Sequence, residues 1–323
     1  MKNSVLCIGV ANVDVIKHVD TGFLVRHRID KGTTTLMRSA DILSMIDDLQ
    51  NPAFIPGGCA ANTSCGVSAL GIETIFTGMI HDDQSGQAFR EGFTPYGVQF
   101  HAGFHPEKKT SLCATLVTPD KERSFVLSPD AASWYLGEAN LPEHDPEKQL
   151  IVYTEANLFR MTSGTTLQSL VHAVIETYTG PNTRIILNLI DTDITIHQRQ
   201  TIMALIQSKK LAYVMCNAEE LMALFNSGLE TAIESAGKTG QIFITTLGKD
   251  GAVIIEHDNV TKIDAIFVPH EDIADLIGAG DQFAAGFVAG IAAGKSVLDA
   301  CRQGALKASE ILVVEGARPR IKA

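Results

Sequence analysis

The chain has 323 residues, of which 45% are hydrophobic and 20% are charged, a composition typical of globular proteins. Its formal net charge of −11 argues against nucleic acid or an anionic membrane as a partner, because both repel an acidic surface. The longest uncharged apolar-rich run, residues 282–294, is shorter than the roughly 20 residues that span a bilayer. Six scattered cysteines without a C-x-x-C pair, and the lack of a signal-peptide pattern, predict a cytoplasmic protein with free thiols.

The chain begins with a short apolar run at residues 4–10, which predicts a buried strand. Asn12 and Asp14 follow this run. Ligands of open α/β sheets bind beyond the carboxyl ends of the strands, so these two side chains are candidates for a binding site. They also suit a turn, and the pattern by itself leaves both interpretations open.

The following segments change from a strand-like to a helical pattern. Residues 15–37 alternate loosely and indicate exposed strands, whereas residues 39–49 follow helical spacing. A second helix is predicted directly after Gly57 and Gly58, and it carries Asn62 among many small side chains. Small side chains let a helix pack tightly against a sheet, so most positions of this helix are expected to be architectural.

Residues 98–130 contain a predicted hairpin, which would form a small sheet together with residues 14–36. One face of such a sheet has no helix to cover it, so it needs a ligand or a partner chain. We therefore expect this sheet to be a lid on a larger α/β domain, since 323 residues exceed what a single core usually supports. The predicted lid comprises residues 14–36 and 98–130, and the predicted large domain comprises residues 1–13, 37–97 and 131–323.

From about residue 131, predicted strands alternate with helices. This order predicts βαβ units, and hence an α/β fold with a mostly parallel sheet and helices on both faces, in three layers. Asn217 and Glu220 have the spacing of a capping box at the start of one helix. Further on, a strand ending at Thr246 leads into a turn that contains Gly248 and Gly251.

Residues 278–281 have the layout of a helix N-terminus, with Gly278, Ala279 and Gly280 preceding Asp281. Unpaired N–H groups at a helix start bind anions, and glycines let a phosphate approach them. Asp281 could then accept the proton of an alcohol that attacks this phosphate. The alternative is an ordinary Gly-rich cap with an acid in the first turn. A dinucleotide G-x-G-x-x-G motif does not fit, because Phe283 occupies the third glycine position.

Three of these segments resemble signatures of the ribokinase-like (PfkB) carbohydrate and nucleoside kinases. Residues 9–14 resemble G-x-x-N-x-D and residues 57–62 resemble G-G-x-x-x-N. Residues 275–281 resemble D-T-x-G-A-G-D, with Leu276 in place of the usual Thr. The resemblance extends over essentially the whole chain, and the ending at residues 316–319 is similar to the bacterial adenosine-kinase-like branch.

The resemblance implies a ribokinase-like fold. It also implies an ATP- and Mg²⁺-dependent kinase that phosphorylates the primary hydroxyl of a ribose-containing substrate, and the hydroxyl that fits best is the 5′-hydroxyl of adenosine. It implies that Asp281 is the base, beside an anion site formed by Gly278, Ala279 and Gly280. The implied substrate-binding residues are Asn12, Asp14, Gly57, Gly58 and Asn62. The implied ATP-binding residues are Asn217, Thr246, Gly248 and Gly251, with Glu220 positioning the metal through water.

Several alternatives stay open at this point. The acceptor could be a free sugar such as ribose or fructose, or the chain could be a nucleoside or nucleotide sensor without turnover. A base would need an apolar or aromatic slot near the lid. The candidates for that slot are Phe104, Trp134, Tyr135 and Phe159. Potassium activates some members of the family, and lids of this type occur in monomers and in lid-mediated homodimers.

Overall fold

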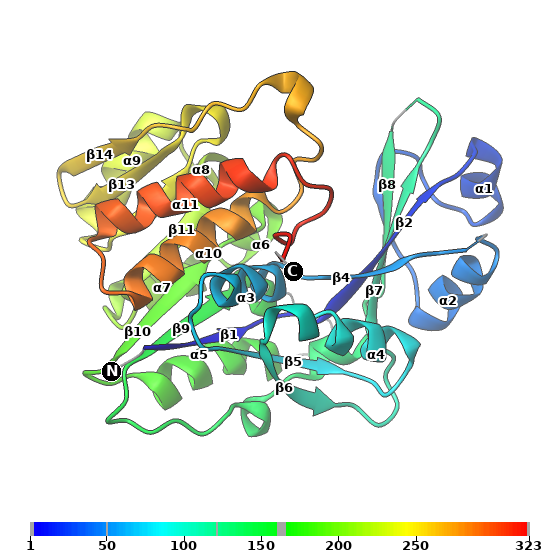
Figure 1. Ribbon diagram of the computed structural model, residues 1–323, viewed down its shortest axis with the longest axis horizontal. Helices are drawn as coiled ribbons and strands as arrows, with labels where there is room; N and C mark the ends of the chain where they lie inside the picture. Colours follow the sequence, from blue (N-terminus) through cyan, green and yellow to red (C-terminus); the bar gives the residue numbers. More distant parts are fainter. Residues whose placement is uncertain (1–2, 50, 121, 160–165, 322–323) are drawn as a thin grey trace.

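The computed structural model describes residues 3–49, 51–120, 122–159 and 166–321, which form two sheets of unequal size (Figure 1). Within these ranges the large sheet has the strand order β14-β13-β12-β11-β10-β9-β1-β5-β6. The strands from β12 to β6 run parallel, and β13 and β14 extend the edge in antiparallel fashion. The strand bounds are β1 (Ser4–Ile8), β5 (Thr74–Ile80), β6 (Gln99–Phe104), β9 (Leu150–Glu155), β10 (Thr183–Asn188), β11 (Tyr213–Asn217), β12 (Phe243–Thr246), β13 (Ala252–Glu256) and β14 (Asn259–Ile263).

Helices cover both faces of the large sheet, which confirms the predicted three-layer α/β fold (Figure 1). Successive side chains of β1 enter different cores: Val5 and Cys7 pack on one face, and Leu6 and Ile8 pack on the other. Both faces are buried, so the strands are nearly continuous apolar runs. One face is covered by α3 (Cys59–Ala69), α10 (Ala279–Ala292) and α11 (Val297–Ile311). The other is covered by α5 (Thr166–Tyr178), α6 (Thr192–His197), α7 (Arg199–Gln207), α8 (Ala218–Phe225) and α9 (Leu229–Lys238).

The small sheet has the strand order β3-β8-β7-β2-β4 and lies beside the large domain (Figure 1). Its strands are β2 (Asn12–His18), β3 (Thr34–Leu36), β4 (Phe54–Gly57), β7 (Ser111–Val117) and β8 (Arg123–Leu127). Val13 and Val15 of β2 are fully buried and share a core with Phe23 and Ile42. These two side chains belong to α1 (Thr21–Arg26) and α2 (Ser39–Asp47), so helices cover one face of the small sheet.

The division of the chain between the two sheets differs from the predicted one in two places. β6 lies within the segment predicted to belong to the lid, but it pairs with β5 in the large sheet. β4 lies within the segment predicted to belong to the large domain, but it pairs with β2. β6 is an edge strand with alternating exposed and partly buried residues, and this pattern is the same in either sheet.

The prediction of strands throughout residues 15–37 was wrong at α1. Asp20 caps this helix, since its side chain accepts a hydrogen bond from the Phe23 N–H at 2.6 Å. Phe23 and Leu24 then become buried in the core of the small sheet. Tertiary packing of these two side chains therefore decides the local structure.

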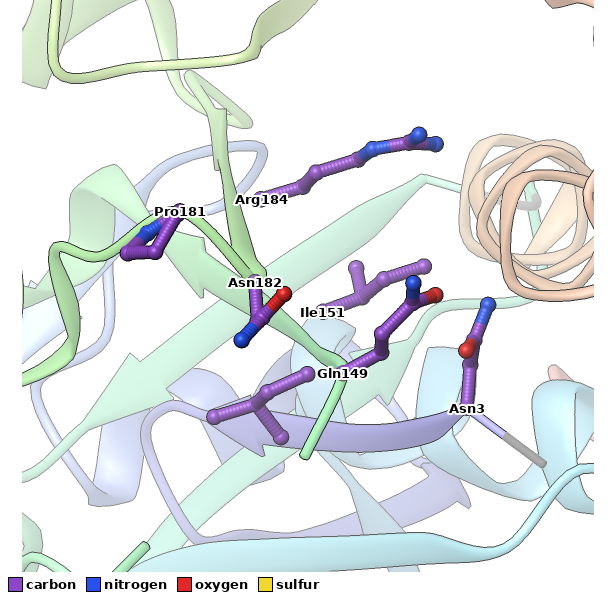
Figure 2. A pocket seen from close by; sticks show the side chains of 7 residues that line it. Asn3, Gln149, Ile151, Pro181, Asn182 and Arg184 are labelled. Atoms are coloured by element: carbon purple, nitrogen blue, oxygen red, sulfur yellow. The ribbon is translucent and has the colours of Figure 1, made fainter. Parts of the chain in front are cut away.

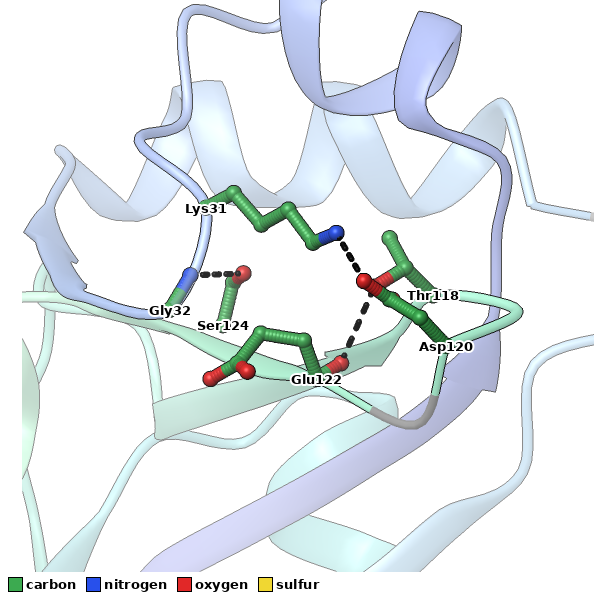
Figure 3. Close-up of polar contacts among 6 residues, drawn as sticks. All are labelled: Lys31, Gly32, Thr118, Asp120, Glu122 and Ser124. Carbon is green, nitrogen blue, oxygen red and sulfur yellow. Dashed lines mark hydrogen bonds and ion pairs between the residues drawn. The ribbon is translucent and has the colours of Figure 1, made fainter.

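Polar contacts hold the outer end of the small sheet together (Figure 3). Lys31 forms an ion pair with Asp120, and Ser124 Oγ accepts a hydrogen bond from the Gly32 N–H at 3.0 Å. Thr118 Oγ1 donates to Asp120 Oδ1 at 2.6 Å. The hydrogen bonds from Lys31 and Thr118 lower the pKa of the Asp120 carboxyl to about 2. These contacts connect the loop before β3 to the turn between β7 and β8.

The parallel strands of the large sheet end at a common edge, where the predicted site residues lie. β9, β11 and β12 end at Glu155, Asn217 and Thr246. The amino ends of the strands lie opposite, and there Asn3, Pro181 and Arg184 line a pocket of about 60 Å³ (Figure 2). Across the described ranges of the chain, no helix combines the length and the apolar character needed to cross a membrane.

Candidate active site

The first part of the site lies where the small sheet meets the large domain. Asn12 Nδ2 donates to Asp14 Oδ1 at 2.7 Å, and both residues lie on β2. Gly57, at the end of β4, is paired with Asn12 across the strands. A Cβ atom on Gly57 would stand 2.1 Å from Asp14 Oδ2, so a side chain there would displace the carboxylate. Glycine at position 57 therefore leaves room for the Asp14 carboxylate in its present position.

The second part is the start of α3, which follows the two glycines. Gly58 is its N-cap residue and has a φ of +91°, and a Cβ there would stand 2.5 Å from the Val10 carbonyl oxygen. Glycine accommodates both the positive φ and the close approach of the carbonyl oxygen, because it has no Cβ. The side chain of Asn62, on the next turn of the helix, is only 5% exposed.

Asp281 lies in the first turn of α10 and is hydrogen-bonded to α3. Asn62 Nδ2 donates to Asp281 Oδ2 at 2.9 Å, and Gln282 Nε2 donates to the Asn62 carbonyl at 3.2 Å. The two signature segments, about 220 residues apart, are therefore in direct contact. Burial raises the pKa of Asp281 from 3.8 to about 6, although the hydrogen bonds from Asn62 and Cys59 oppose this rise. Burial also raises the pKa of Asp14 to about 6.

The N-terminus of α10 has the geometry of an anion site. Gly278 is its N-cap with a φ of +80°, and the first intrahelical bond runs from the Gln282 N–H to the Gly278 carbonyl at 2.8 Å. The N–H groups of Ala279, Gly280 and Asp281 therefore have no acceptor within the helix. Space beside Gly280 is open, because a Cβ there would meet no atom within 4 Å.

Asn217 and Glu220 form the predicted capping box at the start of α8. Asn217 Oδ1 accepts the Glu220 N–H at 2.8 Å, while Glu220 Oε2 accepts the Asn217 N–H at 2.9 Å. Both residues line a chamber of about 170 Å³ together with Gly280 and Asp281. Burial raises the pKa of Glu220 to about 7. The structural interpretation of the motif is confirmed, and the chamber brings Glu220 and Asp281 into one site.

A groove of about 910 Å³ adjoins this chamber, since Thr246, Gly280 and Phe283 line both. Gly248 and Gly251 lie along the groove and have φ values of +59° and +90°. Most of the lining is apolar, from the segment 265–268 and from α11. Leu276, which departs from the family signature, is 71% exposed and also lines the groove. The volume of the groove falls in the range of small-molecule sites, which are also mostly apolar.

Two charged residues of the site, Glu155 and Arg318, were not predicted from the sequence. Glu155, at the end of β9, is fully buried, and its carboxylate accepts the N–H groups of Val10 at 3.0 Å and Ala60 at 2.8 Å. Arg318 Nε donates to Asn62 Oδ1 at 3.0 Å. A charged residue that ends an apolar strand was the available signal for Glu155. Arg318 had been noted only as part of a terminal motif.

Three of the four aromatic residues considered for a base slot pack against other side chains of the protein, whereas the fourth, Phe104, is 52% exposed. Phe159 is 1% exposed within the core, and Trp134 is buried with its Nε1 donating to the Ser128 carbonyl at 3.1 Å. Tyr135 packs against His105, with 4.6 Å between the ring centroids. These three side chains have structural roles. The sequence alone could not distinguish them from ligand-binding aromatics.

Comparisons with known proteins agree with this geometry. The pfkB family carbohydrate kinase profile matches residues 39–322. Adenosine kinase from Dictyostelium discoideum is 24% identical to the chain, over 97% of the chain and 95% of that protein. Fructokinase from Salmonella typhimurium is 26% identical, over 74% of the chain and 77% of that protein.

Solved structures give the same result. That of adenosine kinase from Sinorhizobium meliloti matches with a TM-score of 0.85 and 26% identity, covering 99% of this chain and 97% of that one. A probable sugar kinase from Rhizobium etli CFN 42 matches with a TM-score of 0.86 and 25% identity, covering 99% of this chain and 96% of that one. The chain therefore belongs to the pfkB family of carbohydrate kinases and is a phosphotransferase that acts on an alcohol group.

Proposed function

We propose that the protein transfers the γ-phosphoryl group of ATP to the 5′-hydroxyl of adenosine. The hydrogen bond between Asn62 and Asp281 carries the kinase part of this proposal, because it joins a hydroxyl-binding segment to a carboxylate at a helix N-terminus. The adenosine part is supported by the relatives named adenosine kinase, including those from Dictyostelium discoideum and Sinorhizobium meliloti, whose matches cover 95% or more of both chains.

The open face of the small sheet favours a nucleoside over a free sugar. Asp14 lies opposite Ile55 on β4 and opposite Cys113 on β7, so these side chains share its face of the sheet. By the same alternation Ile16 and Phe125 lie on that face, and they are 37% and 36% exposed. A purine ring attached to a ribose held at Asp14 would cover this apolar surface. A free hexose has no equivalent group.

The chemistry assigned to the site follows from the positions of its donors and acceptors. Asp14 and Asn62 hold hydroxyls of the acceptor, and Gly57 and Gly58 let its ring approach the backbone. Asp281 accepts the proton of the attacking hydroxyl as the oxygen–phosphorus bond forms and the bond to ADP breaks. The unpaired N–H groups at the start of α10 stabilise the charge on the transferred group.

The donor side is assigned to ATP and Mg²⁺. Asn217, Thr246, Gly248 and Gly251 border the chamber and groove in which the nucleotide would lie. Both carboxylate oxygens of Glu220 already accept hydrogen bonds from Asn217, so this residue fits contact with Mg²⁺ through water. When bound, the metal neutralises phosphate charge. The chain has no G-x-x-x-x-G-K-[ST] lysine for this purpose.

A substrate panel tests the proposal. Purified protein would be incubated with ATP, Mg²⁺ and either nucleosides or free sugars, and ADP release would be measured for each. We expect adenosine to give the highest kcat/KM, with AMP as the product by chromatography. Release of ADP with fructose or ribose but not with any nucleoside would refute the adenosine assignment. Repeating the assay with and without potassium tests activation by that ion.

Two alternatives are outcomes of the same panel. A free-sugar kinase is supported by the likeness to fructokinase from Salmonella typhimurium. A sensor would bind a panel member in a thermal-shift assay without releasing ADP. The retained carboxylate of Asp281 favours turnover, because a binding protein has no use for a base beside an anion site.

A further inference from the structure

Arg318 belongs to a segment, residues 317–319, that is hydrogen-bonded across the start of α10. The carbonyl of Ala317 accepts a hydrogen bond from Gln282 Nε2 at 2.9 Å, and the carbonyl of Pro319 accepts one from Tyr96 Oη at 2.9 Å. A Cβ on Gly278 would stand 2.4 Å from Ala317 Cα. The last described residues of the chain accordingly lie beside α3 and β4 in the middle of the molecule (Figure 1).

The guanidinium of Arg318 is held in one position by several contacts. Its Nε donates to Asn62 Oδ1 at 3.0 Å, and its Nη1 donates to the Gly92 carbonyl at 3.0 Å. It also lies over the ring of Phe93, 5.3 Å from the centroid. Its Nη2 is buried and has no hydrogen-bond partner among the residues that the structure describes. A partly buried cation with one buried nitrogen left unsatisfied costs stability, which points to a role other than stability.

These contacts determine how the Asn62 carboxamide is turned. Its oxygen faces a donor, the Arg318 Nε–H, and its nitrogen faces an acceptor, the Asp281 carboxylate. In the flipped orientation, two donors would face each other and two acceptors would face each other. Arg318 therefore keeps the amide hydrogens directed toward the carboxylate proposed as the base.

We infer that Arg318 is a positioning residue for phosphoryl transfer, which orients the Asn62 carboxamide and places a positive charge near Asp14 and Asp281. This inference rests on the proposed function, because it requires Asp281 to act on an acceptor hydroxyl. It concerns an element outside the three signature segments, and it assigns a catalytic purpose to the segment that ends the described chain.

The charge has a measurable consequence. Arg318 opposes the burial-induced rise in the pKa of both Asp14 and Asp281. Besides these two, Cys65 on α3 and Tyr96 interact with the guanidinium, and Cys59 on α3 and Glu155 on β9 interact with Asp281. Losing the charge should raise the pKa of the base, and the acid limb of the kcat/KM profile should move to higher pH.

Three substitutions separate orientation from charge. Arg318→Met removes both, Arg318→Gln keeps a donor for Asn62, and Arg318→Lys keeps the charge. We expect kcat/KM for the acceptor to fall about 10- to 100-fold in Arg318→Met, in line with the loss of one charge-assisted hydrogen bond. KM for ATP should change little. The acid limb should shift upward in the Met and Gln variants and stay in place in the Lys variant.

The matched control is Arg320→Met, because Arg320 is two residues further along and exposed. Guanidinium ion at millimolar concentration should partly restore Arg318→Ala, as expected if the missing cation is the defect. Equal losses in kcat/KM for acceptor and ATP, with an unmoved acid limb and no rescue, would overturn the inference in favour of a purely structural role. The assay uses whichever alcohol the wild type phosphorylates, so failure with adenosine refutes the substrate and leaves Arg318 testable.

Discussion

Replacing Asp281 with Asn should lower activity and raise stability at the same time. The amide keeps the shape of the side chain and can still accept a hydrogen bond from Asn62, which is 2.9 Å away in the wild type. It cannot take up a proton from an alcohol. We therefore expect kcat to fall about 10²- to 10⁴-fold. KM for ATP should stay similar, because backbone N–H groups form the anion site.

The stability effect follows from the pKa. Folding raises the pKa of Asp281 from 3.8 to about 6, mainly through burial. The stability gained from the protonated group is fully present below pH 3.8 and is lost as the pH rises through about 6. The full shift corresponds to about 3 kcal/mol, which partial solvent contact reduces to about 1–3 kcal/mol. The Asn variant does not suffer this loss, so it should be more stable than the wild type at pH 8.

The measurement is urea unfolding of both proteins at several pH values, together with initial rates of ADP release. The control is Asp272→Asn, which removes the same charge from an exposed position near the same helix. A stability difference that opens between pH 4 and pH 6 in Asp281→Asn but not in the control agrees with the reasoning. Two results would refute it: an Asn variant that is less stable at pH 8, or one that keeps most of the wild-type kcat.

Three further outcomes are expected. Gly58→Ala should lower the free energy of unfolding by more than Gly71→Ala. Both glycines have a positive φ, but only at Gly58 would the added Cβ stand 2.5 Å from a carbonyl oxygen, that of Val10. Urea unfolding measures the difference, and equal losses would contradict the prediction. Burial raises the pKa of Glu155 from 4.5 to about 7. The free energy of unfolding of the wild type relative to Glu155→Gln should therefore fall by about 3 kcal/mol between pH 4.5 and pH 7.5. Parallel curves of unfolding free energy against pH would contradict this. Ala308→Phe should fill the apolar groove and raise KM for ATP at least about tenfold. KM for the acceptor should not change. An unchanged KM for ATP would mean that the nucleotide binds elsewhere.

Much of the architecture could be predicted because it follows from local patterns. The central strands of the large sheet are continuous apolar runs separated by helices. Asn217 and Glu220 have a spacing that predicts a capping box by itself. The contact between Asn62 and Asp281 could be expected from the resemblance alone, since no local pattern connects residues so far apart.

Other features depend on tertiary contacts and could not be predicted. β4 and β6 are short, half-exposed strands, and their alternation does not reveal which sheet they join. Glu155 becomes a site residue because it meets two backbone N–H groups from distant segments. The same holds for Arg318, whose importance depends on the folding of its segment over α10.

The residues proposed to hold the acceptor are divided between the small sheet and the large domain. Asp14 and Gly57 lie on strands of the small sheet, whereas Asn62 and Asp281 lie on helices of the large domain. A polyol that spans the two groups would draw the sheet and the domain together over the phosphate. A water molecule is too small to span them. Because one binding site is divided between the small sheet and the large domain, ATP would not be hydrolysed when no acceptor is bound.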